Sequence, residues 1–337
     1  MPKTDNQQRS TSRLPRKVAR RLERSSTFAS LRRGTAAFTS EFGSSAKAKA
    51  LDGGSAPRGN KVGIVHIQKC GGTNLKQVMV SSPDFYGGPR YWGGSAFQRS
   101  KAFVSDRSKK TKWAPIWELS GIVDDHAGII GHYTGSTLIE AGCSTILFYA
   151  REPRSRVISQ YRFWQIQGKA YWQEQMGEAK GAEFAEMLDA GFGSFLRSES
   201  VTATHARTNH IARRLLDLPG RPDPTPETLV ERWDQFSPYV VGGYWINQTD
   251  DFLARITAET GIPLERPNRA AKNVTPKTAE PEQITKAELA MLDECTAVDQ
   301  LLLERMMEDG ILSPRSKEEL DNEFAALLAA HHIEIVD

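Results

Sequence analysis

The chain has 337 residues, of which 39% are hydrophobic and 25% charged, and it carries a net charge of +3. This composition is typical of a globular protein and excludes collagen and wholesale disorder. The longest apolar runs are strand-sized, well short of the roughly 18 residues that a membrane-spanning helix needs. Three scattered cysteines, Cys70, Cys143 and Cys295, fit neither a disulfide framework nor a zinc site, which favours a reducing compartment.

Residues 1–60 differ in charge from the rest of the chain. They contain thirteen Lys/Arg and four Asp/Glu, a net charge of +9, which leaves −6 for the remainder. They have few aromatic residues, so they cannot bury enough apolar surface to offset the entropy of ordering. We expect a disordered basic N-terminal arm, which is either an organelle transit segment, an electrostatic tether to membrane or nucleic acid, or a tail without a role. The expected location is the cytoplasm or an organelle lumen, not the membrane.

The first ordered element begins at Lys61. Val62 to Ile67 is an apolar run that predicts a buried strand, and the residues from Leu75 to Met79 suit a helix capped near Thr73 or Asn74. Between them lies the loop Gln68-Lys69-Cys70-Gly71-Gly72-Thr73-Asn74. A strand, a glycine loop and a helix form a phosphate-binding arrangement, because backbone N–H groups and the helix N-terminus attract an anion.

This loop is not the nucleotide-binding loop of ATPases and GTPases. That signature has its lysine after the last glycine, whereas Lys69 precedes Gly71 and Gly72. Taken alone, the glycines would indicate no more than a turn. Their significance depends on a second segment further along the chain.

The second segment is another buried strand, from Ser144 to Ala150, followed directly by a helix. Pro153 suits the first turn of that helix, on which Ser155 and Ser159 are four residues apart and share one face. Arg151 follows the strand, where open α/β folds contact their ligands. A guanidinium group beside a serine hydroxyl predicts a second anion site.

The two segments resemble those of sulfotransferases that use 3′-phosphoadenosine 5′-phosphosulfate (PAPS), particularly the carbohydrate-modifying, heparan-sulfate-type branch. The first family motif reads H-x-P-K-T-G-G-T-S, and the chain matches it at His66, Lys69, Gly71, Gly72 and Thr73 but departs at Gln68, Cys70 and Asn74. The second reads R-E-P-x-S-R-x-x-S-x-Y, and Arg151 to Tyr161 match every specified position. Weaker similarities are Gly131-His132, Asn209 with Arg213, and Val241-Gly242, so the resemblance covers residues 60–310.

The resemblance implies a site for PAPS as co-substrate, without an obligatory metal. Lys69 and Thr73 would hold the 5′-phosphosulfate end, and Arg151 and Ser159 would hold the 3′-phosphate. The remaining predicted donor contacts are Gly71, Gly72 and Asn74 of the first loop, with Lys272 from a basic late loop.

Sulfuryl transfer needs a base at the acceptor hydroxyl and positive charge at the leaving oxygen. We assign the second role to Lys69. His132 is the proposed base, since a neutral imidazole is available near pH 7 and the resemblance places a base in this Gly-His segment. Glu118, Asp124 and Asp125 are alternatives. His66 is a fourth candidate, but its place just upstream of the loop suggests that it supports Lys69.

The acceptor is expected to be a hydroxyl compound, most simply a carbohydrate, and not a nucleic acid. Residues 81–125 could bind it with Tyr86, Trp92, Trp113 and Trp117 and with five basic residues (Lys101, Arg107, Lys109, Lys110 and Lys112), or could be a solvated basic loop. Tyr161, Phe163 and Trp164 are interpreted as core contacts, outside the site.

The predicted architecture is one α/β domain over residues 61–312, with a P-loop-like parallel sheet of about four or five strands flanked by helices. Amphipathic helices are expected from Thr285 to Met307 and from Lys317 to Ala330, and residues 313–337 are expected to form a C-terminal helical extension. The predicted activity is sulfuryl transfer from PAPS to a hydroxyl. The rivals are a kinase-like phosphotransferase that uses ATP and magnesium, and a nucleotide-binding protein without turnover.

Overall fold

The structure is a computed structural model that describes residues 60–88, 97–98, 101–105, 111–216, 225–265 and 281–337. The chain divides into two compact units, Met1–Gly54 and Ser55–Asp337. The basic arm predicted over residues 1–60 lies outside the described residues, except for Asn60. Everything below concerns the second unit.

A five-stranded parallel sheet forms the centre of this unit and confirms the predicted fold class. Its middle strands are entirely buried, as expected of a parallel sheet with helices on both faces. In spatial order the strands are β2 (Phe85–Gly87), β6 (Gly128–Gly131), β1 (Val62–Val65), β7 (Thr145–Ala150) and β8 (Val240–Trp245).

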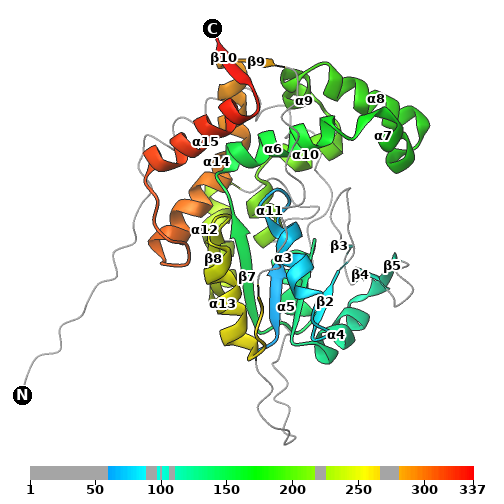
Figure 1. The fold of residues 1–337 in the computed structure, drawn as a ribbon, viewed down its shortest axis with the longest axis vertical. Coiled ribbons are helices and arrows are strands. Elements are labelled where there is room, and N and C mark those ends of the chain that lie inside the picture. The colour runs from blue at the N-terminus through cyan, green and yellow to red at the C-terminus, as the bar shows by residue number, and fades with distance from the viewer. Residues whose placement is uncertain (1–59, 89–96, 99–100, 106–110, 217–224, 266–280) are drawn as a thin grey trace, which may run out of the picture. The chain divides into compact units, whose positions relative to one another are not determined.

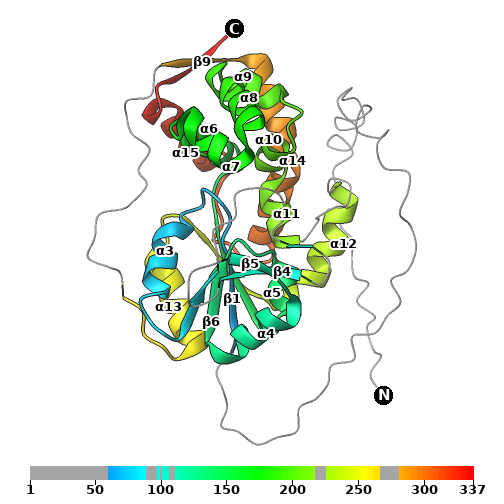
Figure 2. The same cartoon turned by 90° about the vertical axis from the view of Figure 1, so that its right-hand side faces the viewer.

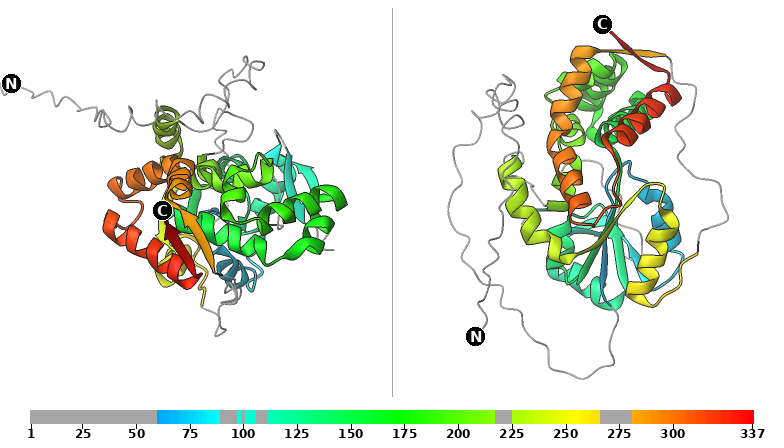
Figure 3. Two further views of the ribbon diagram at one scale, coloured as in Figure 1. Left: turned by 90° about the horizontal axis from the view of Figure 1, so that it is seen from above. Right: turned by 90° about the vertical axis from the view of Figure 1, so that its left-hand side faces the viewer.

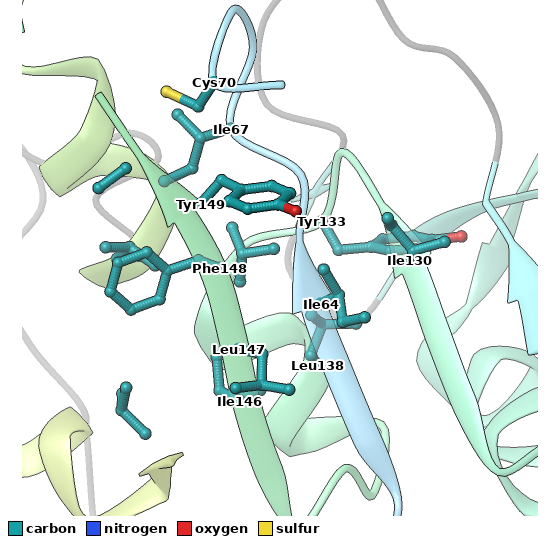
Figure 4. Close-up of a cluster of buried hydrophobic side chains, with 14 of the residues drawn as sticks. Ile64, Ile67, Cys70, Ile130, Tyr133, Leu138, Ile146, Leu147, Phe148 and Tyr149 are labelled. Atoms are coloured by element: carbon teal, nitrogen blue, oxygen red, sulfur yellow. The ribbon is translucent and has the colours of Figure 1, made fainter. Parts of the chain in front are cut away.

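Helices cover both faces of the sheet (Figure 2). On one face lie α3 (Gly72–Met79) and α13 (Thr249–Thr260), and on the other α5 (Gly135–Glu140), with α4 (Ile116–Asp125) beside it. The core between these layers contains Ile64, Ile130 and Leu147, and Figure 4 shows it continuing upward to Cys70 in the loop above β1. The loop that follows β1 therefore packs directly against the hydrophobic core of the sheet.

A second group of helices follows the carboxyl end of β7 (Figure 1). It has its own buried cluster, which includes Tyr161, Trp164 and Phe195. Its elements are α6 (Pro153–Gln165), α7 (Gly168–Met176), α8 (Glu178–Asp189), α9 (Phe192–Arg197) and α10 (Val201–Arg207). The next helix, α11 (His210–Leu216), buries its apolar residues in the core of the sheet. After α12 (Pro226–Phe236) and a 3-10 turn (Ser237–Tyr239), the chain enters β8.

The long helix α14 (Lys286–Glu308) contacts α6, α11 and α12 and so connects this helical group to the sheet (Figure 3). Its first residues are fixed by a capping box in which Thr285 and Glu288 bond to each other's backbone N–H. The second predicted helix is α15 (Lys317–Ala330), which Ser316 caps in the same way. Both predicted C-terminal helices are confirmed.

Residues 313–337 are not a helical extension alone. After α15 the chain forms β10 (Ile333–Val336), which pairs in parallel with β9 (Glu282–Thr285). Phe324, Leu328 and Ile333 are buried in the cluster around α6. The segment therefore belongs to the same compact unit, because its apolar residues complete a core that begins at residue 157.

Part of the predicted acceptor-binding segment forms a small antiparallel sheet, which the sequence did not indicate. Its strands are β3 (Phe97–Gln98), β4 (Lys101–Ser105) and β5 (Thr111–Pro115), and α4 follows. Among the described residues, no helix combines the length and apolar character that crossing a bilayer requires.

Candidate functional site

The first loop leaves β1 and turns into α3 at two glycines. Gly71 has φ +82, a left-handed conformation that glycine adopts without strain. A Cβ on Gly72 would lie 2.1 Å from Cδ2 of His66, so the close packing of the His66 ring requires a glycine here. The helix starts at Gly72 with Gly71 as its cap, so it begins near Thr73 and Asn74 as predicted, and the cap residue itself is a glycine.

The N-terminus of α3 is suited to an anion. No side chain within the described segments caps it, and its first turn carries no acidic residue. The first N–H groups of a helix have no partner inside the helix, and the helix dipole gives them a partial positive charge. Gly71, Gly72, Thr73 and Asn74, the donor contacts expected in this loop, all line the cavity described below.

The second loop differs, because the N-terminus of α6 is already occupied by a carboxylate. Glu152 is buried and accepts hydrogen bonds from the backbone N–H groups of Arg154, at 3.2 Å, and Ser155, at 2.6 Å. Any anion at this loop must therefore be bound by side chains. Of the two serines on the helix, Ser159 lines the cavity, whereas Ser155 is fully buried.

Arg151 connects the two loops. Its Nη1 donates a hydrogen bond to the backbone oxygen of Lys69, at 3.3 Å, although the residues are 82 positions apart. Its Nε is buried without a hydrogen-bond partner in the described part of the chain, and Glu323 Oε1 lies 4.0 Å from it. A guanidinium with an unused buried donor fits an oxyanion ligand.

The two loops line one cavity of about 820 Å³. This volume is within the range of small-molecule and cofactor sites. All the predicted donor-binding residues that the structure describes line it, together with both candidate histidines: Lys69, Gly71, Gly72, Thr73, Asn74, Arg151, Ser159, His66 and His132. Lys272 lies outside the described residues.

Lys69 occupies an unusual position in the loop. Its φ is +67, uncommon for a residue with a side chain, and its Nζ lies 4.2 Å from the centre of the Phe163 ring. Burial and then the nearby charge of Arg151 lower the pKa of Lys69 from 10.5 to about 8. The ammonium is thus poorly solvated and would gain from an anionic partner.

Cys70 stands where the motif of the resembling sulfotransferases has a threonine. Cys70 is fully buried and does not line the cavity. Burial raises the pKa of its thiol to about 12, so the thiol stays protonated and packs as an apolar group. Gln68, the other departure in this part of the loop, does line the cavity.

His132 lies in the cavity wall, stacked on His66 with ring centres 4.3 Å apart. Its Nδ1 is 3.2 Å from the backbone oxygen of His66, which can only accept, so Nδ1 carries the proton and Nε2 is the basic nitrogen. Burial, followed by the influence of His66 and Arg214, holds the pKa of His132 well below 6.5. The ring is therefore neutral at pH 7.

The alternative bases are not in the cavity wall. Glu118, Asp124 and Asp125 belong to α4, and none of them lines the cavity. The backbone oxygen of Asp124 accepts a hydrogen bond from Nζ of Lys61, which precedes β1. The end of α4 therefore lies at the amino end of the sheet, whereas the cavity lies at its carboxyl end.

Sequence reasoning missed one wall of the cavity. Phe163, Gln167, Tyr171 and Gln175 of α6 and α7 line it, and so do Ile246 and Thr249 beyond β8. Tyr161 and Trp164 are core residues as predicted, but Phe163 is half-buried and contacts Lys69. The signal was only partial, because Phe163 lies one helical turn beyond Ser159 on α6, whereas a break at Gly168, with φ +73, separates both from Tyr171 and Gln175 on α7.

Comparison with known proteins finds no protein-family model that matches the chain and no curated protein that matches its sequence. Within the described ranges, no three His, Cys, Asp or Glu side chains are grouped so that they could hold a metal ion. The geometry of the cavity is therefore the basis for assigning a function.

Proposed function

We propose that the protein is a sulfotransferase that moves the sulfuryl group of PAPS to a hydroxyl group, most simply of a saccharide. The observation that carries this proposal is the meeting of Lys69 and Arg151 at one cavity. They come from separate strand–helix loops, yet a hydrogen bond joins the Arg151 guanidinium to the backbone of Lys69. PAPS carries negative charge at both the 5′ and 3′ positions of one ribose, and two adjacent cationic loops are the complement of that charge pattern.

Each end of the donor has a suitable partner. The uncapped N-terminus of α3, with Thr73, would hold the 5′-phosphosulfate. Arg151 would hold the 3′-phosphate through its guanidinium, whose Nε has no hydrogen-bond partner among the described residues and faces the Glu323 carboxylate at 4.0 Å, with Ser159 adding a hydroxyl. Since Glu152 occupies the N-terminus of α6, the 3′ site depends on these side chains.

The reaction needs a base and a cation, and the cavity holds both. Neutral His132 would remove the proton of the acceptor hydroxyl through Nε2. Lys69 would stabilise the negative charge that develops on the leaving phosphate oxygen, as its protonated ammonium lies in a partly buried site where such interactions are strong. Positioning and electrostatics do most of the work in the related phosphoryl transfers.

The kinase alternative lacks a feature that it needs. The residues after the second glycine are Thr73 and Asn74, so the phosphate-binding lysine of ATPases is missing from its position. A nucleotide-binding protein without turnover would keep the cavity and bind the same ligand. Only the proposed enzyme would transfer a sulfuryl group, so an assay of sulfuryl transfer distinguishes the two.

The test is transfer of ³⁵S from labelled PAPS to a panel of glycans by the wild-type protein, Lys69→Ala and Arg151→Ala. We expect Lys69→Ala to lower kcat/KM by about 10²–10³-fold and Arg151→Ala to weaken PAPS binding by about 10–100-fold. Lys317→Ala and Arg305→Ala, on the surfaces of α15 and α14, are the matched controls and should behave as wild type. Wild-type turnover by either loop variant would refute the assignment.

A further inference from the structure

One wall of the cavity is uncharged. It consists of Phe163 of α6, Gln167 in the turn between the two helices, and Tyr171 and Gln175 of α7. Phe163, Gln167 and Tyr171 are half-buried, and Gln175 is exposed at the rim. We call these four residues the α6–α7 wall.

The α6–α7 wall adjoins the reacting group and not the far end of the donor. The ring of Phe163 lies 4.2 Å from Lys69 Nζ, the ammonium assigned to the leaving oxygen. In PAPS the adenine is attached to C1′ of the ribose, whereas the transferred sulfuryl group is attached to C4′ through C5′ and the 5′-phosphate, several bonds away. The Phe163 ring next to Lys69 is therefore close to the incoming acceptor. The adenine would then bind elsewhere in the cavity.

A second uncharged surface of the cavity is available for the adenine. Ile246 and Thr249 line the cavity beyond β8. The side chain of Ile246 packs against the first loop, since a Cβ on Gly71 would lie 2.9 Å from its Cγ1. The Ile246 side chain suits the flat face of adenine, and binding of 3′-phosphoadenosine 5′-phosphate (PAP) by Tyr171→Ala, described below, decides between this surface and the α6–α7 wall as the adenine site.

The chemistry of the wall indicates which acceptor it takes. Aromatic rings pack against the C–H faces of sugars, and glutamine amides both donate and accept, which matches hydroxyl groups. The Gln167 amide is already oriented, because its Nε2 donates to the backbone oxygen of Phe163, at 3.2 Å, so its Oε1 remains as an acceptor for hydroxyls. None of the four residues carries a charge that would pair with a carboxylate or sulfate on the acceptor.

We propose that the α6–α7 wall is the acceptor site and that it selects an uncharged polyhydroxyl compound, such as a neutral oligosaccharide, over an acidic one. This inference rests on the proposed function. Because the negative charge of the bound donor compensates the Lys and Arg side chains that line the cavity, Lys69, Lys76 and Arg151, the wall decides the charge preference of the acceptor.

The test compares maltotetraose with tetragalacturonate as acceptors for labelled PAPS. We expect the wild-type protein to prefer maltotetraose. Tyr171→Ala should raise the KM for maltotetraose about tenfold, and Gln167→Lys should shift the ratio of the two kcat/KM values about tenfold toward tetragalacturonate. Neither change should move the Kd of PAP, measured by calorimetry, by more than about twofold. If Gln167 had only a structural role, Gln167→Lys would not change the ratio of the kcat/KM values for the two acceptors.

Preference of the wild-type protein for tetragalacturonate, or absence of transfer to maltotetraose, would overturn the acceptor assignment. Loss of PAP binding in Tyr171→Ala would overturn it too, because the wall would then hold the adenine. In each case, tight binding of PAP by the wild-type protein would leave the donor assignment intact. Failure of the wild-type protein to bind PAP would overturn the proposed function itself.

Discussion

The side chain of Lys69 lies in an environment that disfavours its charged, protonated form. Its pKa of about 8 arises from burial and from Arg151, so the free protein loses this charge as the pH rises through that value. An anion is bound by the protonated form, which predominates below pH 8. The positive charge is therefore present at neutral pH and lost in mildly alkaline solution.

This gives a prediction for pH dependence. We expect kcat/KM for PAPS, which reports the free enzyme, to be constant near pH 7 and to fall by up to about tenfold per unit above pH 8. Lys69→Arg should remove that decline, because a guanidinium keeps its proton throughout this range. An unchanged decline in Lys69→Arg would show that another group titrates.

His132 is the second residue whose role can be tested alone. We expect His132→Gln to lower kcat by about 10²–10⁴-fold while leaving the Kd of PAP unchanged. Glu118→Gln and Asp124→Asn are the matched controls, because these carboxylates do not line the cavity and should be dispensable. If Asp124→Asn abolished transfer and His132→Gln did not, the base would have been assigned wrongly.

At the scale of elements, the loop after β1 depends on its second glycine. We expect Gly72→Ala to displace the His66 ring, since a Cβ there would lie 2.1 Å from Cδ2, and to lower both the melting temperature and the affinity for PAP. Gly121→Ala in α4 is the control. A Cβ at Gly121 meets nothing within 4 Å, so the change should stabilise the protein by about 0.5–1 kcal/mol. Equal effects of the two substitutions would contradict this account of the loop.

The two strand–loop–helix elements were predictable because each is encoded locally. An apolar run, a glycine or Pro153, and then a helical pattern locate β1, α3, β7 and α6 to within a few residues. The α6–α7 wall was not foreseen, because aromatic residues on a helix are usually core residues. Only the packing of α6 against the first loop brings Phe163 to Lys69.

The small sheet of β3, β4 and β5 was missed for another reason. Its strands lie in a segment rich in glycine, lysine and aromatic residues, without the alternation that identifies a strand. The parallel pairing of β10 with β9 was also missed. It joins residues about fifty positions apart, and nothing local to either segment indicates the partner.

At the scale of the whole molecule, the C-terminal segment supports the site. Arg154 of α6 pairs with Asp321 of α15 at 2.7 Å, and Glu323 of the same helix lies 4.0 Å from Arg151. Glu323 is in turn held by Arg315, at 2.6 Å. The last helix therefore contacts the arginine assigned to the 3′-phosphate.

Removal of residues 313–337 should destabilise the protein and not simply shorten it. Phe324, Leu328 and Ile333 are buried, and burial of each such side chain contributes about 1.5–3 kcal/mol. We expect the truncated chain to unfold at a clearly lower temperature, with weakened binding of PAP, in thermal denaturation and calorimetry. A truncated chain with wild-type stability would mean that the segment is a dispensable extension after all.

The central claim is that the first loop and Arg151 together recognise an adenosine phosphorylated at both the 5′ and 3′ positions. Calorimetry of the wild-type protein with PAP, ADP and ATP with magnesium tests it most directly. We predict that PAP binds at least about a hundredfold more tightly than ADP, and that Arg151→Ala removes most of this difference, because charge-assisted hydrogen bonds to the 3′-phosphate are lost. Equal affinity for PAP and ADP, or a preference for ATP, would contradict the claim.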